Sequence, residues 1–262
     1  MNAIEAERVQ AQVAAAGGEG KRAYVQRMFS DIAPRYDLLN HLLSFNIDRR
    51  WRAAALEDLG WRERPEGRYL DLCAGTLDVG VQLAGEKGFR GTVASADFAE
   101  PMLRSGLWKR DGRPVVPVVA DAQELPVADH AFDGAIVAFG IRNLADLDAG
   151  LREARRVLAP GGRFVILEFS TPRSAFVRAG YHAYFHHVLP LVGKLVSHHP
   201  TAYRYLPESV ATFPEERVLA ARMEGAGFTR VRWRTLTWGV VAIHVGEQPV
   251  GAGEPPHGAG VT

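Results

Sequence analysis

Short apolar runs recur along the middle of the chain, from about residue 68 onward. Runs of this length, separated by polar and glycine-containing stretches, are typical of strands buried on both faces of a sheet. The five runs are RYLDLC at 68–73, TVASAD at 92–97, VVPVVA at 115–120, DGAIVAF at 133–139 and GRFVILEF at 162–169. The spacing of apolar residues between them predicts helices over 78–87, 99–109 and 146–158.

The segment DLDAGLREARRVL at 146–158 shows the helical pattern, with Leu147, Leu151, Ala154 and Leu158 on one face. The Pro-Gly-Gly sequence that follows predicts the end of this helix. Because strands and helices alternate, the pattern predicts a parallel sheet with right-handed crossover connections.

The C-terminal part of the chain has a different pattern. It predicts helical structure over the aromatic- and histidine-rich residues 174–206 and a short helix over 214–226 that ends at Gly227. Within 228–246 it predicts two strands that turn near Trp238-Gly239. The expected fold is therefore α/β: a doubly wound, mostly parallel seven-stranded sheet that closes with a C-terminal antiparallel hairpin.

Composition divides the chain into a central domain and two tails. Residues 1–20 are rich in Ala, Gly and Glu, which predicts a flexible N-terminal tail, and residues 247–262 have the Gly and Pro content of a disordered C-terminal tail. Between them we expect a single domain over 21–246, in which 174–206 forms a helical insertion on the substrate side.

Charge and cysteine content narrow the function classes. Thirty-one basic and 30 acidic residues leave a formal net charge of +1, which argues against nucleic acid as the main partner. Cys73 is the single cysteine, so no internal disulfide forms, and we expect a cytosolic protein. The N-terminus lacks the apolar core of a secretory signal, and the run VLPLVGKLV at 188–196 is too short to span a bilayer.

The first strand leads into a turn, YLDLCAGTLDVG at 69–80, where ligands bind in doubly wound sheets. Asp71 lies near the strand end, Gly75 lets a ligand approach the backbone, and Thr76 is placed to cap the next helix. Asp97 ends the second strand, about 20 residues after the turn, which is the sequence spacing at which an acidic side chain binds a ribose hydroxyl in such folds. Asp121-Ala122, after the third strand, offers a carboxylate and a backbone N–H to an adenine.

Each of these features also occurs for purely structural reasons, in strand-to-helix turns and polar surface loops. A dinucleotide oxidoreductase would show G-x-G-x-x-G at this turn, whereas only Gly75 precedes the helix and the next glycine is Gly80. NAD is therefore not the first choice of ligand.

Three signatures lie outside this turn: MFSDIAPRYDLLNHLLSFNIDRRWR at 28–52, AFGIRNLADLDAGLREARRVLAPGGRFVILEFSTP at 138–172 and AYRYLPESVATFPEERVLAARMEGAGF at 202–228. With them the chain resembles the ubiquinone/menaquinone biosynthesis C-methyltransferases, within the class I S-adenosylmethionine-dependent methyltransferases. The resemblance covers about residues 20 to 246 and implies a Rossmann-like fold, with cofactor contacts at Thr76, Asp97 and the pair Asp121-Ala122.

The chain departs from the family pattern at two positions. Ala138 stands where some members have a serine that touches the cofactor, and Leu77 replaces the second glycine of a G-T-G-D turn. If Thr76 caps the helix and Leu77 is its first residue, the leucine has ordinary helical dihedral angles. We therefore expect an unstrained Leu77 that packs beside the methionine portion of the cofactor, and a working site.

The resemblance implies methylation of a ring carbon of a polyprenylated quinol, with S-adenosyl-L-methionine as the cofactor. An electron-rich hydroquinone attacks the sulfonium methyl, so aligning the reactants and polarising a phenolic hydroxyl group are the main tasks. By resemblance Arg142 acts through a water to draw off the phenolic proton, with Asn143 beside it. Tyr36 and Asp37 are further candidates, for which a structural role is equally compatible with the sequence.

Five histidines between 182 and 199 invite a metal site, but the segment offers no matching acidic or cysteine ligand. Its aromatic and aliphatic content better suits a groove for a polyprenyl chain or contact with a bilayer surface. We expect no metal, and a peripheral position where a membrane-resident substrate is met. The histidines are His182, His186, His187, His198 and His199.

Several alternatives stay open at this point. The acceptor is a demethylmenaquinol, which we favour by resemblance, or a methoxy-benzoquinol. A class I methyltransferase for another small acceptor is the alternative within enzymes. In a different class, a non-catalytic S-adenosylmethionine-binding protein would carry Leu77 and Ala138 as marks of a decayed site. The sequence does not indicate an oligomeric state or a prenyl chain length.

Overall fold

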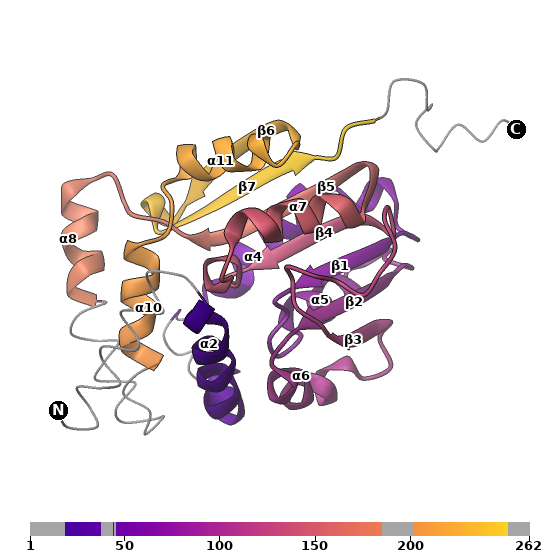
Figure 1. The fold of residues 1–262 in the computed structure, drawn as a ribbon, viewed down its shortest axis with the longest axis horizontal. Helices are drawn as coiled ribbons and strands as arrows, with labels where there is room; N and C mark the ends of the chain where they lie inside the picture. The colour runs from indigo at the N-terminus through magenta and orange to yellow at the C-terminus, as the bar shows by residue number, and fades with distance from the viewer. Residues whose placement is uncertain (1–18, 38–43, 45, 185–201, 251–262) are drawn as a thin grey trace, which may run out of the picture.

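A computed structural model describes residues 19–37, 44, 46–184 and 202–250 of the chain (Figure 1). Its seven strands are β1 (Arg68–Leu72), β2 (Thr92–Asp97), β3 (Val115–Val119), β4 (Phe132–Ala138), β5 (Leu158–Phe169), β6 (Thr229–Leu236) and β7 (Val241–Glu247). The helices are α2 (Glu19–Ile32), α4 (Asp48–Leu59), α5 (Asp78–Ala84), α6 (Glu100–Gly106), α7 (Leu147–Val157), α8 (Ala175–Ala183), α10 (Ala202–Ala211) and α11 (Glu216–Gly225).

The strands form one sheet in the order β3-β2-β1-β4-β5-β7-β6. The pairs from β3 to β5 are parallel, whereas β7 pairs antiparallel with both β5 and β6. The chain returns from β6 to β7 through the short turn Thr237–Gly239, as the sequence predicts. Strand order reverses between β1 and β4, so their carboxyl ends flank the switch point where ligands bind in such sheets.

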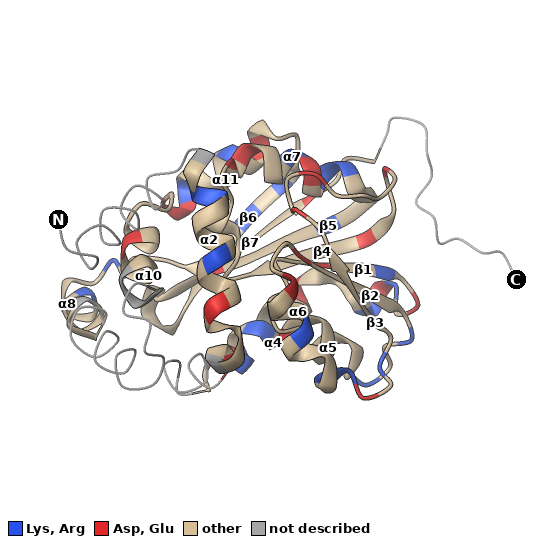
Figure 2. Ribbon diagram, turned by 60° about the horizontal axis from the view of Figure 1, so that its bottom comes forward, with Lys and Arg blue, Asp and Glu red and all other residues tan. Residues whose placement is uncertain are grey.

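Both faces of the sheet are covered, and alternate residues of each central strand serve opposite faces. In β4, Ala135 and Val137 pack with α7 and α11, whereas Ile136 between them packs with α4 and α5. Figure 1 shows α7 and α11 in front of the sheet and α4 behind it. Figure 2 shows acidic and basic positions mixed along α7 and α11. This two-sided burial explains why the strands read as continuous apolar runs.

The predicted start of the fifth strand, at 162, is wrong, whereas the predicted helix end at 158 is within one residue of the observed end. Helix α7 ends at Val157, and β5 already begins at Leu158, so the Pro-Gly-Gly sequence lies inside the strand. The β4–β5 register shifts between Phe132 and Gly134, and Gly161 has a positive φ of 74°. The glycine pair therefore makes an irregularity in β5 instead of a helix stop, because the pairing with β4 starts before it. At the other end of α7, the Asp146 carboxylate caps the helix by accepting from Ala149 N at 3.0 Å.

The region predicted as helical over 174–206 contains α8 and the first part of α10. Residues 185–201 lie outside the described residues, and so do the histidines at 186, 187, 198 and 199 and the apolar run at 188–196. The tails were predicted over 1–20 and 247–262, and their residues 1–18 and 251–262 lie outside the described residues as well. Both tail boundaries are corrected, because Glu19 and Gly20 begin α2 and Glu247 ends β7. Among the helices of the described ranges, none has the length and hydropathy needed to cross a membrane.

Candidate active site

A cleft lies at the carboxyl ends of β1, β2, β3 and β4, and α2 and the residues after it contribute one wall. Six of the nine residues predicted for the site line it: Tyr36, Gly75, Asp97, Asp121, Ala122 and Asn143. Ala138 lines it too. The topology therefore brings together segments that are up to about a hundred residues apart, because parallel strands end at the same edge.

Asp97 is the most rigidly held acid of the cleft. Its Oδ2 accepts a hydrogen bond from Gly75 N at 2.8 Å, and its Oδ1 accepts one from Ala99 N at 2.8 Å. Burial raises the pKa of this carboxyl, and the two backbone hydrogen bonds lower it. The side chain is thus fixed by the turn after β1 and by the start of α6 before any ligand is present.

The turn after β1 contains several residues with positive φ, including Cys73, Gly75 and Leu77. Leu77 has φ 69° and ψ 14°, and α5 begins only at Asp78. The prediction of an unstrained helical Leu77 is therefore wrong, since a non-glycine residue in this region costs about 1–2 kcal/mol. Its side chain is fully buried and is not part of the described cleft lining, so the predicted packing beside the cofactor is not found either.

Thr76 does not cap α5, contrary to the prediction. The N-cap position of α5 is held by Leu77, which has no side-chain capping group, and the Thr76 hydroxyl donates to Asp37 Oδ1 at 2.5 Å. It also accepts from Lys109 Nζ at 3.1 Å. The residue is 2% exposed, so this hydroxyl ties the turn to the segment after α2 and is not a free group on the cleft wall.

Asp71 lies beneath the cleft, not in its wall. Its Oδ2 accepts from Gly80 N at 3.1 Å and from Ser95 Oγ at 3.2 Å, and the residue is 1% exposed. A Cβ at Gly80 would lie 2.4 Å from Ser95 Oγ, so only glycine lets α5 approach β2 this closely. The predicted cofactor contact of Asp71 is therefore corrected to a supporting role, in which the carboxylate holds the first turn of α5.

Asp121 and Ala122 line the cleft after β3, as predicted. The Asp121 carboxylate accepts from Gln123 N at 2.9 Å and pairs with Arg22 Nε at 2.9 Å. Arg22 belongs to α2 and its side chain is 60% exposed, so this ion pair closes one side of the cleft with a solvent-accessible group. An exposed pair of this kind opens at little cost.

Arg142 and Asn143 follow β4 in a short helical turn, Ile141–Asn143. Arg142 Nη1 lies 2.8 Å from Glu168 Oε1, and the pair is almost completely buried, with side chains 7% and 2% exposed. Burial lowers the pKa of the guanidinium, but the Glu168 carboxylate outweighs it and the net pKa is raised. Arg142 is therefore a fixed cation, and its side chain is not part of the described cleft lining.

Asn143, in contrast, lines the cleft directly. It is 9% exposed, and its Oδ1 is buried without a hydrogen-bond partner among the described residues. A buried amide without a partner is unusual in native proteins and marks a place where a ligand or water completes the hydrogen bonding. Arg142 donates to Phe139 O and pairs with Glu168, so it holds the backbone on which Asn143 stands.

Three cationic residues at or beside the cleft were not singled out in the sequence: Lys21, Arg22 and Lys109. Lys21 Nζ donates to Arg142 O at 2.8 Å, and burial together with the Arg142 charge lowers its pKa to about 8. Lys21, Arg22 and Lys109 stand in unremarkable charged stretches, so no local pattern distinguishes them. Glu168 did carry a signal, because it is an acid inside an otherwise apolar strand.

A sequence model for the ubiE/COQ5 methyltransferase family matches residues 18–248 of the chain. The demethylmenaquinone methyltransferase of Thermus thermophilus is 50% identical over 224 residues, which are 85% of this chain and 100% of that protein. The ubiquinone/menaquinone biosynthesis C-methyltransferase UbiE of Geobacter sulfurreducens is 44% identical over 228 residues, or 86% of this chain and 88% of that protein. These relatives extend over nearly the whole described chain.

Solved structures agree in fold. A methyltransferase of Thermotoga maritima, described as a possible histamine N-methyltransferase, superposes with a TM-score of 0.57 at 19% identity. The match covers 85% of this chain and 99% of that one. Together with the observed strand order, it confirms the predicted class I fold with its antiparallel C-terminal strands.

Proposed function

This chain belongs to the ubiE/COQ5 methyltransferase family, and we propose that it methylates a ring carbon of a prenylated demethylmenaquinol. It is an S-adenosylmethionine-dependent C-methyltransferase of menaquinone or ubiquinone biosynthesis. The choice of demethylmenaquinol is supported by relatives from Thermus and from Mycolicibacterium that carry the name demethylmenaquinone methyltransferase.

One observation supports the assignment of the cleft most strongly. At the switch point between β1 and β4, a fixed carboxylate (Asp97) and an amide oxygen without a partner (Asn143 Oδ1) line the same cleft. The carboxylate suits a ligand that carries hydroxyl groups, and the amide suits a second polar group. Both groups stand on backbone that other residues fix, so the site is preformed.

S-Adenosyl-L-methionine supplies an electrophilic methyl group on a sulfonium. We assign its binding to Asp97, Gly75 and the pair Asp121-Ala122, which line adjoining parts of the cleft. Asp97 keeps lone pairs for hydroxyl donors after bonding Gly75 N and Ala99 N, because each carboxylate oxygen accepts more than one hydrogen bond. Arg22 leaves Asp121 readily, since the arginine is mostly exposed.

On the acceptor side we assign the orienting role to Asn143 and an aromatic wall to Tyr36. The Tyr36 ring packs edge-on against Phe29 at 5.9 Å, and both residues line the cleft. The earlier idea that Arg142 draws off the phenolic proton loses support, because Glu168 holds and neutralises the guanidinium. Arg142 instead positions Asn143, whose amide polarises a hydroxyl of the hydroquinone.

The test is methyl transfer from labelled S-adenosyl-L-methionine to reduced demethylmenaquinol and, separately, to reduced methoxy-benzoquinol. We expect product from demethylmenaquinol, and Asn143→Ala should lower kcat by about tenfold to a hundredfold while the KM for the cofactor changes little. Product from the methoxy-benzoquinol alone would contradict the proposed acceptor. Cofactor binding without transfer to either quinol would favour a different acceptor or a binding protein.

Contact with a bilayer is the second part of the proposal. Phe176 and Trp238 are the two most exposed large apolar side chains in the described ranges, at 90% and 82%. Ser174, two residues before Phe176, lines the same surface hollow as Trp238 and the exposed Arg173. Exposed aromatic rings beside a cation are the composition of interfacial membrane anchors.

The position of this surface relative to the cleft supports a lipid occupant. Phe139 lines the cleft, and its ring lies 4.8 Å from Phe169 and 6.0 Å from Trp51. Trp51 Nε1 donates to Thr237 Oγ1 at 2.7 Å, next to Trp238. An apolar aromatic series thus extends from the cleft wall to the exposed turn, as a substrate with an isoprenoid tail requires.

Sedimentation with vesicles that contain anionic lipid tests this contact. Trp238→Ser and Phe176→Ser should each lower the bound fraction, and the pair should lower it further. Trp108→Ser is the matched control, because Trp108 is also 76% exposed but follows α6 near the opposite edge of the sheet. Equal binding by all variants would contradict a bilayer contact at this turn.

A further inference from the structure

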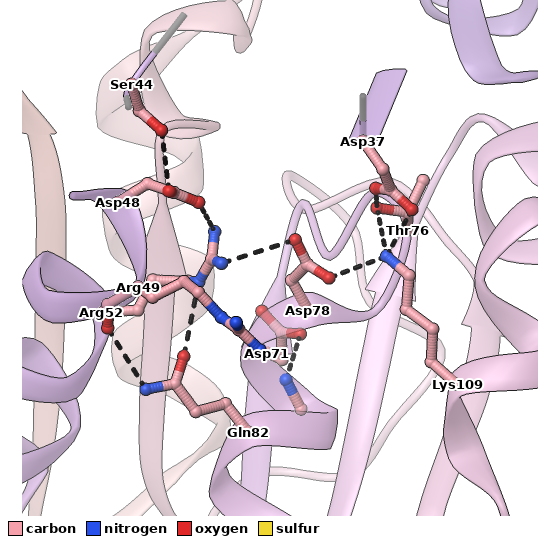
Figure 3. A network of polar contacts seen from close by, with 11 residues as sticks. Asp37, Ser44, Asp48, Arg49, Arg52, Asp71, Thr76, Asp78, Gln82 and Lys109 are labelled. Atoms are coloured by element: carbon pink, nitrogen blue, oxygen red, sulfur yellow. Dashed lines mark hydrogen bonds and ion pairs between the residues drawn. The ribbon is translucent and has the colours of Figure 1, made fainter. Parts of the chain in front are cut away.

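Lys109 lies beside the turn after β1, outside the described cleft lining. It belongs to the short helical segment Leu107–Arg110 after α6, and its side chain is only 10% exposed. Its ammonium contacts three oxygens: Asp37 Oδ2 at 2.6 Å, Asp78 Oδ1 at 2.7 Å and Thr76 Oγ1 at 3.1 Å (Figure 3). Three acceptors match the three donors of a lysine, so the buried charge is fully satisfied.

The three partners come from separate parts of the chain. Asp37 follows α2 and the turn Ala33–Arg35, Thr76 is in the turn after β1, and Asp78 begins α5. Asp37 uses its second oxygen to accept from the Thr76 hydroxyl. Lysine, threonine and aspartate therefore form a closed triangle of contacts between the N-terminal segment and the turn.

A second cation extends the network from α4. Arg52 Nη1 pairs with Asp48 Oδ2 at 2.8 Å, and Arg52 Nη2 lies 3.5 Å from Asp78 Oδ2 (Figure 3). Asp78 thus shares its carboxylate between Lys109 and Arg52. The side chain of Arg52 is 8% exposed, which makes these contacts less screened than surface ion pairs.

The position of Tyr36 connects this network to the cleft. Tyr36 directly precedes Asp37 and lines the cleft, where its Cε1 atom lies 3.8 Å from the point a Cβ on Gly75 would occupy. Fixing Asp37 against Thr76 therefore fixes the backbone that carries the Tyr36 ring beside the turn. Without the lysine, the carboxylates of Asp37 and Asp78 would face each other without a cation between them.

We propose that Lys109 is a positioning residue for cofactor binding, which holds Asp37 on Thr76 and so keeps the Tyr36 side of the cleft closed on the turn. It touches no reacting group and acts through Asp37. The inference rests on the proposed function only in that the cleft takes S-adenosyl-L-methionine, and it is independent of the acceptor.

The experiment measures calorimetric binding of S-adenosyl-L-homocysteine to the full chain. Lys109→Met, which keeps the length and removes the charge, should raise Kd by about tenfold or more, since it leaves the Asp37 carboxylate without its cation and Asp78 with Arg52 alone. In the methyl-transfer assay with acceptor present, the KM for the cofactor should rise. The kcat at saturating cofactor should change by less than about threefold, because Lys109 does not contact the reacting groups. Lys109→Arg, which restores the cation, should recover part of the affinity.

Two further variants keep the inference falsifiable if Lys109→Met folds poorly. Asp37→Asn removes the charge that pairs with Lys109, and the same loss of affinity for S-adenosyl-L-homocysteine is expected. The double variant Lys109→Met/Asp37→Asn should lose no more affinity than either single variant, because both changes break the same contact. Arg104→Met is the control, because Arg104 lies on the preceding helix and its side chain is 73% exposed in a local pair with Glu100. Unchanged Kd in folded Lys109→Met or Asp37→Asn would overturn the inference alone, whereas wild-type protein that binds no cofactor analogue would overturn the proposed function with it.

Discussion

Asp71 and Asp97 lie near the carboxyl ends of neighbouring parallel strands, and their surroundings differ sharply. Both oxygens of Asp97 accept backbone N–H groups, and the carboxylate lines the cleft. Asp71 accepts two hydrogen bonds on Oδ2 alone, and its Oδ1 has no partner among the described residues. Burial raises the pKa of both carboxyl groups, that of Asp71 to about 7.

Asp71 and Asp97 both lie near the end of an apolar strand in the sequence, yet one supports a helix and the other lines the cleft. Asp97 lies in the cleft wall with both oxygens held by backbone N–H groups; these hydrogen bonds lower its pKa, but burial outweighs them and the net pKa is raised. Asp71 faces α5, where burial favours the protonated form and the side chain acts as a brace for Gly80 N. A carboxylate at a strand end can therefore bind a ligand only when its side chain points toward the cleft, which depends on its position along the strand.

Removing the cleft carboxylate should have the largest effect. Asp97→Ala deletes the proposed hydroxyl acceptor and leaves the buried Gly75 N–H without its partner, so we expect Kd for S-adenosyl-L-homocysteine to rise by about a hundredfold or more. Calorimetry measures it, and Asp97→Asn, which keeps one acceptor oxygen, should lose less. Normal affinity in Asp97→Ala would remove this acid from the binding site.

Asp71→Asn should change the pH dependence of stability more than binding. The folded pKa of about 7 lies above the ordinary 3.8, so the stabilising contribution of protonated Asp71 is fully present below about pH 4 and is lost as pH rises through 7. An asparagine does not titrate. The variant should therefore lack this downward slope between pH 4 and 7, which is at most about 1.4 kcal/mol per pH unit.

Urea unfolding of both proteins across this pH range measures the slope. The difference in unfolding free energy, variant minus wild type, should grow with pH up to about 7 and then level off. Parallel curves would mean that Asp71 is already ionised in the folded protein at low pH, and the contrast with Asp97 would disappear.

The smallest expected effect is the difference in stability between glycine and alanine at position 77, in the turn after β1. Leu77→Ala and Leu77→Gly both remove a fully buried side chain, so both variants should be less stable than wild type. Because position 77 has φ 69°, glycine should be more stable than alanine there by about 1 kcal/mol, the reverse of the order expected inside a helix. Denaturant unfolding decides, and a more stable alanine variant would mean that the turn is not strained.

Much of the fold followed from the sequence because burial on both faces leaves a local signature. The apolar runs at 92–97 and 115–120 coincide with β2 and β3 to within one residue, and the turn at Trp238-Gly239 joins β6 to β7. The start of β5 was misplaced by four residues because Pro-Gly-Gly is typical of a break between elements, whereas pairing with β4 draws Leu158 into the sheet before it.

The sequence by itself determined the order of strands and helices, the position of the ligand turn and the family, since each depends on local periodicity or on contiguous motifs. The tertiary structure alone decided that Asp71 points beneath the cleft, that the Thr76 hydroxyl is bound by Asp37, and that Leu77 is left-handed. These outcomes depend on packing between segments far apart in the chain. Lys109 shows this most clearly, because its charge has meaning only where folding brings Asp37 and Asp78 to the same place.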